Sequence, residues 1–119
     1  DVCFIAKVDD TILGFAWLYF GVSKYEEAYE MELTFSDDEA LMYDREVFKD
    51  FRRFGVGNKL NEERLRYLKY KNYKKALVLI KFDNIPSIKS FERFGFEAIK
   101  YITFKKILFV KRAGEHIIR

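Results

Sequence analysis

The residues best suited to chemistry lie in one short stretch, Arg52 to Asn58, which reads Arg-Arg-Phe-Gly-Val-Gly-Asn. Two arginines precede Gly55 and Gly57, and a helical pattern begins at Val56. Glycines let a ligand approach the main chain closely because they carry no Cβ atom. The first N–H groups of a helix are unpaired and partly positive, so they favour a phosphate. We therefore expect this turn to bind a phosphate group.

Two better-known phosphate loops do not fit this spacing. A P-loop ends in Gly-Lys followed by serine or threonine, but Gly57 is followed by Asn58, and Lys59 by Leu60. The dinucleotide fingerprint needs a third glycine three residues after the second, where this chain has Leu60. The remaining pattern is Arg-x-x-Gly-x-Gly.

A second motif follows the run Lys75–Lys81, whose apolar residues predict a buried parallel strand. Asn84 is a plausible helix cap, Pro86 suits the first turn, and Gly95 suits the end of that helix. The chain therefore reads as strand, glycine loop, helix, strand, and then a short helix that ends at Gly95-Phe96.

The two motifs in this order resemble those of the GNAT superfamily of N-acetyltransferases. The resemblance implies an α/β fold in which a central mixed sheet, flanked by helices, splays into a wedge that holds acetyl-CoA. It implies transfer of an acetyl group from acetyl-CoA to a primary amine of a small molecule or protein. The 119 residues are then one domain that begins at the family's second strand. A cytoplasmic location is expected because no signal-peptide pattern and no cysteine pair is present. The wall missing from the acceptor pocket would belong to absent sequence or to a partner. An exposed edge strand and an apolar sheet face would favour self-association as a homodimer.

The resemblance also implies a set of cofactor-binding residues. Val47 and Phe48 match positions whose backbone holds the pantetheine arm and the thioester. The pyrophosphate loop would comprise Arg52, Arg53, Phe54, Gly55, Val56, Gly57 and Asn58, and the second motif would add Asn84, Ser87 and Phe91. For Phe48 and Phe91, a plain core role is an equal alternative.

The candidate catalytic groups are an acid that protonates the departing thiolate and a base that accepts a proton from the amine. Many relatives carry at the position of Phe91 a tyrosine that protonates the departing thiolate, so Tyr43 or a water would have to serve here. A lysine-type amine has a pKa of about 10.4 and must lose a proton before it attacks. Asp44 is the preferred candidate base and Glu46 the second, although Asp44 could simply pair with Arg45 or a loop lysine. Glu30 and Glu32 are further candidates for acceptor contacts.

The elements that would position these residues follow from hydrophobic periodicity. Strands are expected at Val2–Val8, Ile12–Phe20, Tyr29–Phe35, Ala40–Phe48, Lys75–Lys81, Ala98–Phe104 and Lys106–Lys111, with a frayed tail at 113–119. The residues 21–27 read as irregular. A helix is expected at Val56–Asn72, with Val56, Leu60, Tyr67 and Leu68 inward and Glu62, Glu63, Arg64 and Arg66 toward water. A bulge in the strand before the loop would change which face Asp44 and Glu46 share.

Composition narrows the function classes. Half of the residues are hydrophobic, no run of about 18 apolar residues predicts a membrane span, and Cys3 and His116 build no metal site.

Charge is unevenly distributed along the sequence. Residues 1–50 hold 13 acidic and 4 basic residues, a net charge of −9, whereas residues 51–119 hold 6 acidic and 18 basic, a net charge of +12. One interpretation is that the surface charges simply cluster. The other is that the basic half meets a polyphosphate cofactor and the acidic half faces a cationic amine acceptor. Nucleic acid is not expected, because acids interrupt the basic half and no nucleic-acid motif is present. A catalytically silent acyl-CoA-binding domain remains the alternative to an enzyme.

Overall fold

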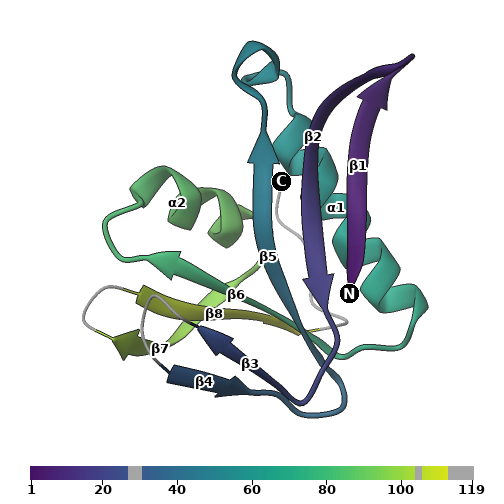
Figure 1. The fold of residues 1–119 in the computed structure, drawn as a ribbon. Coiled ribbons are helices and arrows are strands. Elements are labelled where there is room, and N and C mark those ends of the chain that lie inside the picture. Colours follow the sequence, from purple (N-terminus) through teal and green to yellow (C-terminus); the bar gives the residue numbers. More distant parts are fainter. Residues whose placement is uncertain (27–30, 104–105, 113–119) are drawn as a thin grey trace.

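The computed structural model describes residues 1–26, 31–103 and 106–112 (Figure 1). Its strands are β1 (Val2–Val8), β2 (Thr11–Tyr19), β3 (Ser23–Glu26), β4 (Met31–Thr34), β5 (Glu39–Val47), β6 (Lys75–Lys81), β7 (Glu97–Thr103) and β8 (Lys106–Arg112). The helices are the 3₁₀ turn η2 (Lys49–Phe51), α1 (Val56–Tyr70) and α2 (Ile85–Arg93). Six strands form one sheet in the order β1-β2-β5-β6-β8-β7, and β3 pairs with β4 separately. Since β5–β6 is parallel and the other pairs are antiparallel, the expected mixed sheet is confirmed.

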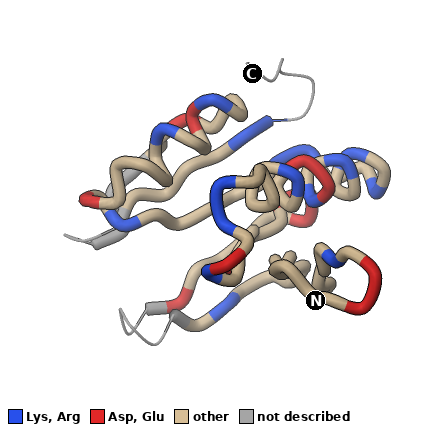
Figure 2. The backbone as a smooth tube through the Cα atoms, turned by 90° about the horizontal axis from the view of Figure 1, so that it is seen from above, with Lys and Arg blue, Asp and Glu red and all other residues tan. Residues whose placement is uncertain are grey.

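The two main helices cover the same face of the sheet, as the view from above shows (Figure 2). One core cluster joins Leu68 of α1 and Phe91 of α2 to the sheet residues Leu18, Met42 and Val78. A second cluster lies on the opposite face, where the residues of β4 and its C-terminal flank pack against β5, β6 and β8. No helix in the described parts of the chain is long and apolar enough to cross a bilayer.

The centre of the sheet opens between β5 and β6. Their parallel pairing runs from Glu39 with Lys75 only as far as Met42 with Val78. Beyond that point the two strands continue to Val47 and Lys81 without pairing to each other. The expected wedge is therefore present, and it begins at Tyr43.

The anticipated bulge is also present in β5. Phe15 pairs with Glu46 but Trp17 pairs with Tyr43, so one extra residue of β5 lies opposite Ala16. Asp44, inside the bulge, adopts a left-handed backbone with φ of 47°. Because the bulge breaks the strand's alternation, Asp44 and Glu46 are not related by a simple two-residue repeat.

The expectation for residues 21–27 needs correction, because this stretch, expected to be irregular, contains β3. The expected strand Tyr29–Phe35 is confirmed over its described residues as β4, which ends at Thr34 and pairs with β3. The hairpin forms because Leu33 and Phe35 bury their side chains over the apolar sheet face, where Phe35 also contacts Tyr19. Residues 27–30 with Glu30, Phe104, and the tail 113–119 with His116 lie outside the described residues. The other predicted strands and the predicted helices are confirmed within two residues at each end.

Arg64 is the second correction, because it does not face water. Its side chain is 1% exposed, on the face of α1 that also carries Leu60 and Leu68. Its Nη1 donates to the carbonyl oxygen of Trp17 at 3.0 Å, and its Nη2 donates to Oδ1 of the fully buried Asn61 at 2.6 Å. Arg64 thereby ties α1 to β2 at the residue where the register against β5 shifts.

Candidate functional site

The glycine loop presents an uncapped helix start. Gly55 is the N-cap of α1 with φ of 79°, and no side chain caps the first turn. The first N–H groups of the helix, from Val56 onward, therefore have no intrahelical partner. A Cβ atom at Gly57 would lie 3.1 Å from Nη1 of Arg45, so a glycine here gives the Arg45 side chain room beside the helix start.

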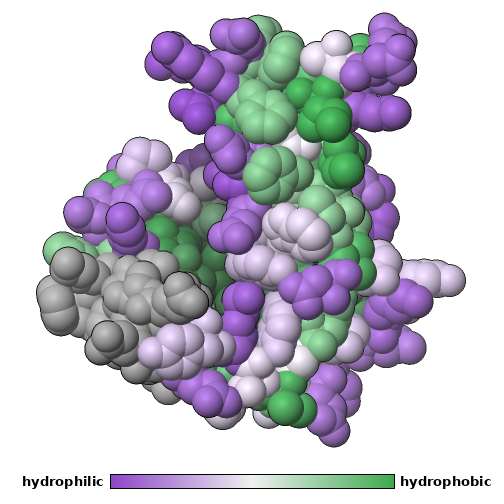
Figure 3. Space-filling model, in the orientation of Figure 1, coloured by the Kyte–Doolittle hydropathy of each residue, from purple (hydrophilic) through white to green (hydrophobic). Residues whose placement is uncertain are grey.

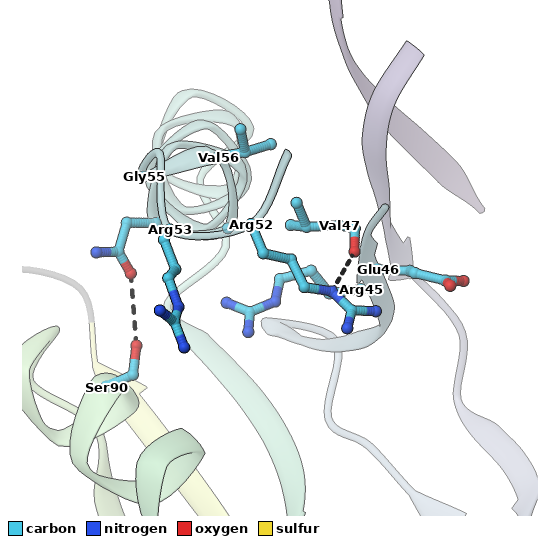
Figure 4. A pocket seen from close by; sticks show the side chains of 10 residues that line it. Arg45, Glu46, Val47, Arg52, Arg53, Gly55, Val56 and Ser90 are labelled. Atoms are coloured by element: carbon cyan, nitrogen blue, oxygen red, sulfur yellow. Dashed lines mark hydrogen bonds between the residues drawn. The ribbon is translucent and has the colours of Figure 1, made fainter. Parts of the chain in front are cut away.

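A cavity of about 410 Å³ lies in front of this helix start. Its lining comes from the end of β5, the loop, the first turn of α1 and one residue of α2 (Figure 4). The lining residues are Arg45, Glu46, Val47, Arg52, Arg53, Gly55, Val56, Gly57, Asn58 and Ser90. Ser90 bridges the cavity, because its Oγ donates to Oδ1 of Asn58 at 3.4 Å and so links α2 to α1.

Three arginine side chains gather at this cavity (Figure 4). Arg52 is fixed by its Nε, which donates to the carbonyl oxygen of Val47 at 2.9 Å. The Arg45 guanidinium lies over the ring of Phe91, 5.9 Å from its centroid. Arg45 keeps contact with solvent, yet partial burial lowers the pKa of its guanidinium. Among the described residues none of the three forms an ion pair with a carboxylate, so the cavity is a cationic site suited to a polyanion.

The cavity brings together most of the residues predicted to bind the cofactor. Seven of the predicted cofactor residues line it, namely Val47, Arg52, Arg53, Gly55, Val56, Gly57 and Asn58, and the candidate base Glu46 lines it as well. Sequence reasoning missed Arg45 and Ser90 as lining residues. The sequence suggests Arg45 only as an ion-pair partner for Asp44. The bulge expected in the same strand is the feature that could have indicated that the Arg45 side chain turns toward the loop.

Five other predicted cofactor residues do not line the cavity. Phe54 is 77% exposed, and Phe48 packs edge-on against Phe15. Phe91 lies in the core against Phe96 at 5% exposure, which agrees with its alternative reading as a core aromatic. Asn84 caps α2 by accepting a hydrogen bond at 3.3 Å from the backbone N–H of Ser87, so this pair has a structural role.

The three candidate catalytic residues follow one another on β5. The Tyr43 hydroxyl donates to Oδ2 of Asp1. Burial raises the pKa of Tyr43, and the charge of Asp44 raises it further, so the hydroxyl stays protonated at neutral pH. Asp44 is exposed in the bulge and forms no ion pair with Arg45. Glu46 is exposed as well, and its carboxylate points away from the arginines (Figure 4).

Within residues 1–26, 31–103 and 106–112, no three His, Cys, Asp or Glu side chains are grouped so as to hold a metal ion. What the site offers is an unpaired helix start, three guanidinium groups, and a wedge between two strands. These features fit an elongated anionic cofactor that carries a diphosphate.

Comparisons with known proteins bear on this site. The sequence model of the acetyltransferase (GNAT) family matches residues 1–96. A comparison with curated protein sequences found no match. Among solved structures, the ribosomal-protein-S18-alanine N-acetyltransferase from Escherichia coli is similar with a TM-score of 0.73 at 18% identity, covering 99% of this chain and 70% of that one.

Two further similar structures contain coenzyme A or acetyl coenzyme A. The PaiA N-acetyltransferase from Thermoplasma acidophilum, in complex with coenzyme A, has a TM-score of 0.71 at 15% identity, over 93% of this chain and 60% of that one. A structure from Bacillus anthracis in complex with acetyl coenzyme A has a TM-score of 0.72 at 19% identity, over 92% of this chain and 61% of that one. At these identities the likeness establishes the fold.

Proposed function

The chain belongs to the acetyltransferase (GNAT) family, and from that premise we propose that it transfers an acetyl group from acetyl-CoA to a primary amine. The observation that carries the proposal is the cationic cavity at the uncapped start of α1, placed beside the opening between β5 and β6. A diphosphate would be held by the N–H groups that follow Gly55 and by the guanidinium groups of Arg45, Arg52 and Arg53. The family match and the fold support this use of the cavity.

The reaction requires little from the protein beyond positioning and proton transfer. When bound, acetyl-CoA supplies an activated thioester. Val47 lines the cavity at the end of β5, so the backbone of this strand is placed to orient the arm that leads to the thioester. In the proposed mechanism Asp44, exposed in the bulge at the start of the wedge, takes a proton from the incoming amine. Tyr43, whose raised pKa keeps its hydroxyl protonated, gives a proton to the departing sulfur.

The test is release of coenzyme A thiol when the chain is mixed with acetyl-CoA and a panel of primary amines. We expect release with at least one polyamine, amino sugar, peptide or lysine-type amine. Binding of acetyl-CoA without release for any amine would instead favour a silent acyl-CoA-binding domain. That alternative has one observation in its favour, since Phe91 has no proton to give and is buried in the core.

A substitution of Asp44 tests its proposed role as the general base. Asp44→Asn keeps the left-handed backbone, which asparagine adopts readily, and removes the basic carboxylate. We expect transfer to slow about a hundredfold, the lower range for general base catalysis, with acetyl-CoA affinity unchanged. Asp9→Asn is the matched control, because Asp9 is another exposed aspartate with a left-handed backbone, in the β1–β2 turn. Equal turnover in the Asp44 and Asp9 variants would exclude Asp44 as the base.

A further inference from the structure

A primary amine of the chain itself is already placed next to a candidate catalytic residue. Lys24, on β3, holds its Nζ 4.5 Å from the centroid of the Tyr43 ring and 5.1 Å from that of Tyr19. Both distances are within the range of cation–π contacts. Lys24 is partly buried, and no carboxylate of the described residues pairs with it. Two aromatic rings, rather than an acid, therefore hold this ammonium group.

The rings belong to an aromatic surface on the sheet face opposite the helices. Trp17 lies opposite Tyr43 in the β2–β5 ladder, and their rings stack with centroids 6.2 Å apart. Figure 3 shows this face, where apolar side chains lie over β1, β2 and β5 between polar margins. We call Tyr19 and Tyr43 together the aromatic seat of Lys24.

The aromatic seat lies at the start of the wedge. Tyr43 is the first residue of β5 after the β5–β6 pairing ends at Met42. The cationic cavity begins two residues further along, at Arg45, which corresponds to about 7 Å of strand. An acyl group in the wedge would therefore reach β5 from the cavity side, and the amine of Lys24 would reach it from the open sheet face. The two groups would meet across this strand.

We propose that Lys24 is an acetyl acceptor, so that the chain acetylates itself at this residue. The inference rests on the proposed function, because it uses acetyl-CoA as the donor. Lys24 loses one proton from its ammonium group to solvent, and the neutral Nζ then bonds to the thioester carbonyl carbon as the C–S bond breaks. The second proton that leaves Nζ ends on the sulfur, giving coenzyme A thiol and Nε-acetyl-lysine. The acetylated side chain carries no charge, so it loses its cation–π contact with the aromatic seat.

The experiment incubates the whole chain with acetyl-CoA and follows acetylation of each lysine by peptide mass spectrometry. We expect Lys24 to be modified at least about tenfold faster than the other lysines, because its amine is already positioned. The rate of Lys24 acetylation per molecule should not depend on protein concentration, because the acetyl-CoA site and the acceptor lysine belong to the same chain. Lys24→Arg should remove this fast modification, and Lys7→Arg, at an exposed strand lysine, should leave it intact.

The aromatic seat is tested separately. Tyr19→Phe keeps the ring and Tyr19→Leu removes it, so only the leucine variant should slow Lys24 acetylation. In proton NMR without cofactor, the side-chain CH₂ signals of Lys24 should show an upfield ring-current shift that Tyr19→Leu reduces. Acetyl transfer to an added amine without preferential Lys24 modification, or a Lys24 rate that rises with protein concentration, would overturn this inference alone. Failure to bind acetyl-CoA, or binding without release of coenzyme A thiol for any amine, would overturn it together with the proposed function.

Discussion

Replacement of Arg64 tests how a buried cation is tolerated in this fold. Burial, with a smaller contribution from repulsion by Arg45, lowers the pKa of Arg64 from its ordinary value to about 9. A lowering of that size corresponds to about 5 kcal/mol of net free energy lost when the charged group is buried. Replacing Arg64 removes this cost, but it leaves the carbonyl oxygen of Trp17 and Oδ1 of Asn61 without their donor, at about 1–3 kcal/mol each. The two effects are of similar size.

We therefore expect Arg64→Met to change the free energy of unfolding by no more than about 2 kcal/mol, because a flexible apolar side chain fills the space without the cost of charge burial. Arg64→Ala should be less stable than Arg64→Met by about 2–5 kcal/mol, since it leaves a cavity beneath the bulge. Urea denaturation of the wild type and both variants measures these differences, provided that the denaturant slopes are equal.

The wild type and Arg64→Met also allow a test of how stability depends on pH, and the direction of the change can be predicted. The cost of burying the Arg64 cation is fully present below its folded pKa of about 9. Between that value and the ordinary pKa of a guanidinium group, the folded chain binds fewer protons than the unfolded chain, so stability rises with pH. The wild type should gain about 1.4 kcal/mol relative to Arg64→Met for each pH unit above 9, and the subtraction removes titrations common to both. A flat difference between pH 8 and pH 10, or a loss above about 4 kcal/mol in Arg64→Met, would refute the reasoning.

Three smaller changes test other parts of the account. Gly14→Ala should destabilise the fold by about 1–3 kcal/mol in urea denaturation, because its Cβ would lie 2.5 Å from the backbone oxygen of Glu46; an unchanged midpoint would contradict this close approach. Arg53→Ala should weaken acetyl-CoA binding about tenfold in calorimetry, or 1.4 kcal/mol, while Arg66→Ala, at an arginine paired with Glu63 on α1, should not. Asn84→Ala should cost about 1 kcal/mol of stability through loss of the α2 cap, and a larger loss of cofactor affinity than of stability would give Asn84 a direct binding role.

Local signals in the sequence predicted the parts of the fold that depend on neighbouring residues. Gly55 sets the left-handed N-cap of α1, and Asn84 and Gly95 bound α2, because caps and turns are decided by a few adjacent residues. The glycine loop was likewise predictable as the start of a helix. The family resemblance added the wedge, which no local pattern specifies.

The features that the sequence did not predict depend on distant contacts. Arg64 was assigned to water by its charge, although Leu60 and Leu68 lie four residues away on either side and mark the buried face. When buried, it donates a hydrogen bond to the carbonyl oxygen of Trp17, at the residue where the register between β2 and β5 shifts. Arg45, which lines the cavity, lies next to the bulge residue Asp44 in the same part of β5. The strand β3 forms because β4 lies beside it, and its own sequence gave no strand pattern.

The central claim is that the cationic cavity at the start of α1 binds acetyl-CoA by its diphosphate. Calorimetric titration of the chain with acetyl-CoA, beside acetyl-pantetheine, which lacks the diphosphate, tests it most directly. We expect saturable acetyl-CoA binding that weakens as salt is added, and much weaker binding of acetyl-pantetheine. Equal affinity for the two compounds, or no binding of acetyl-CoA at millimolar concentration, would contradict the claim.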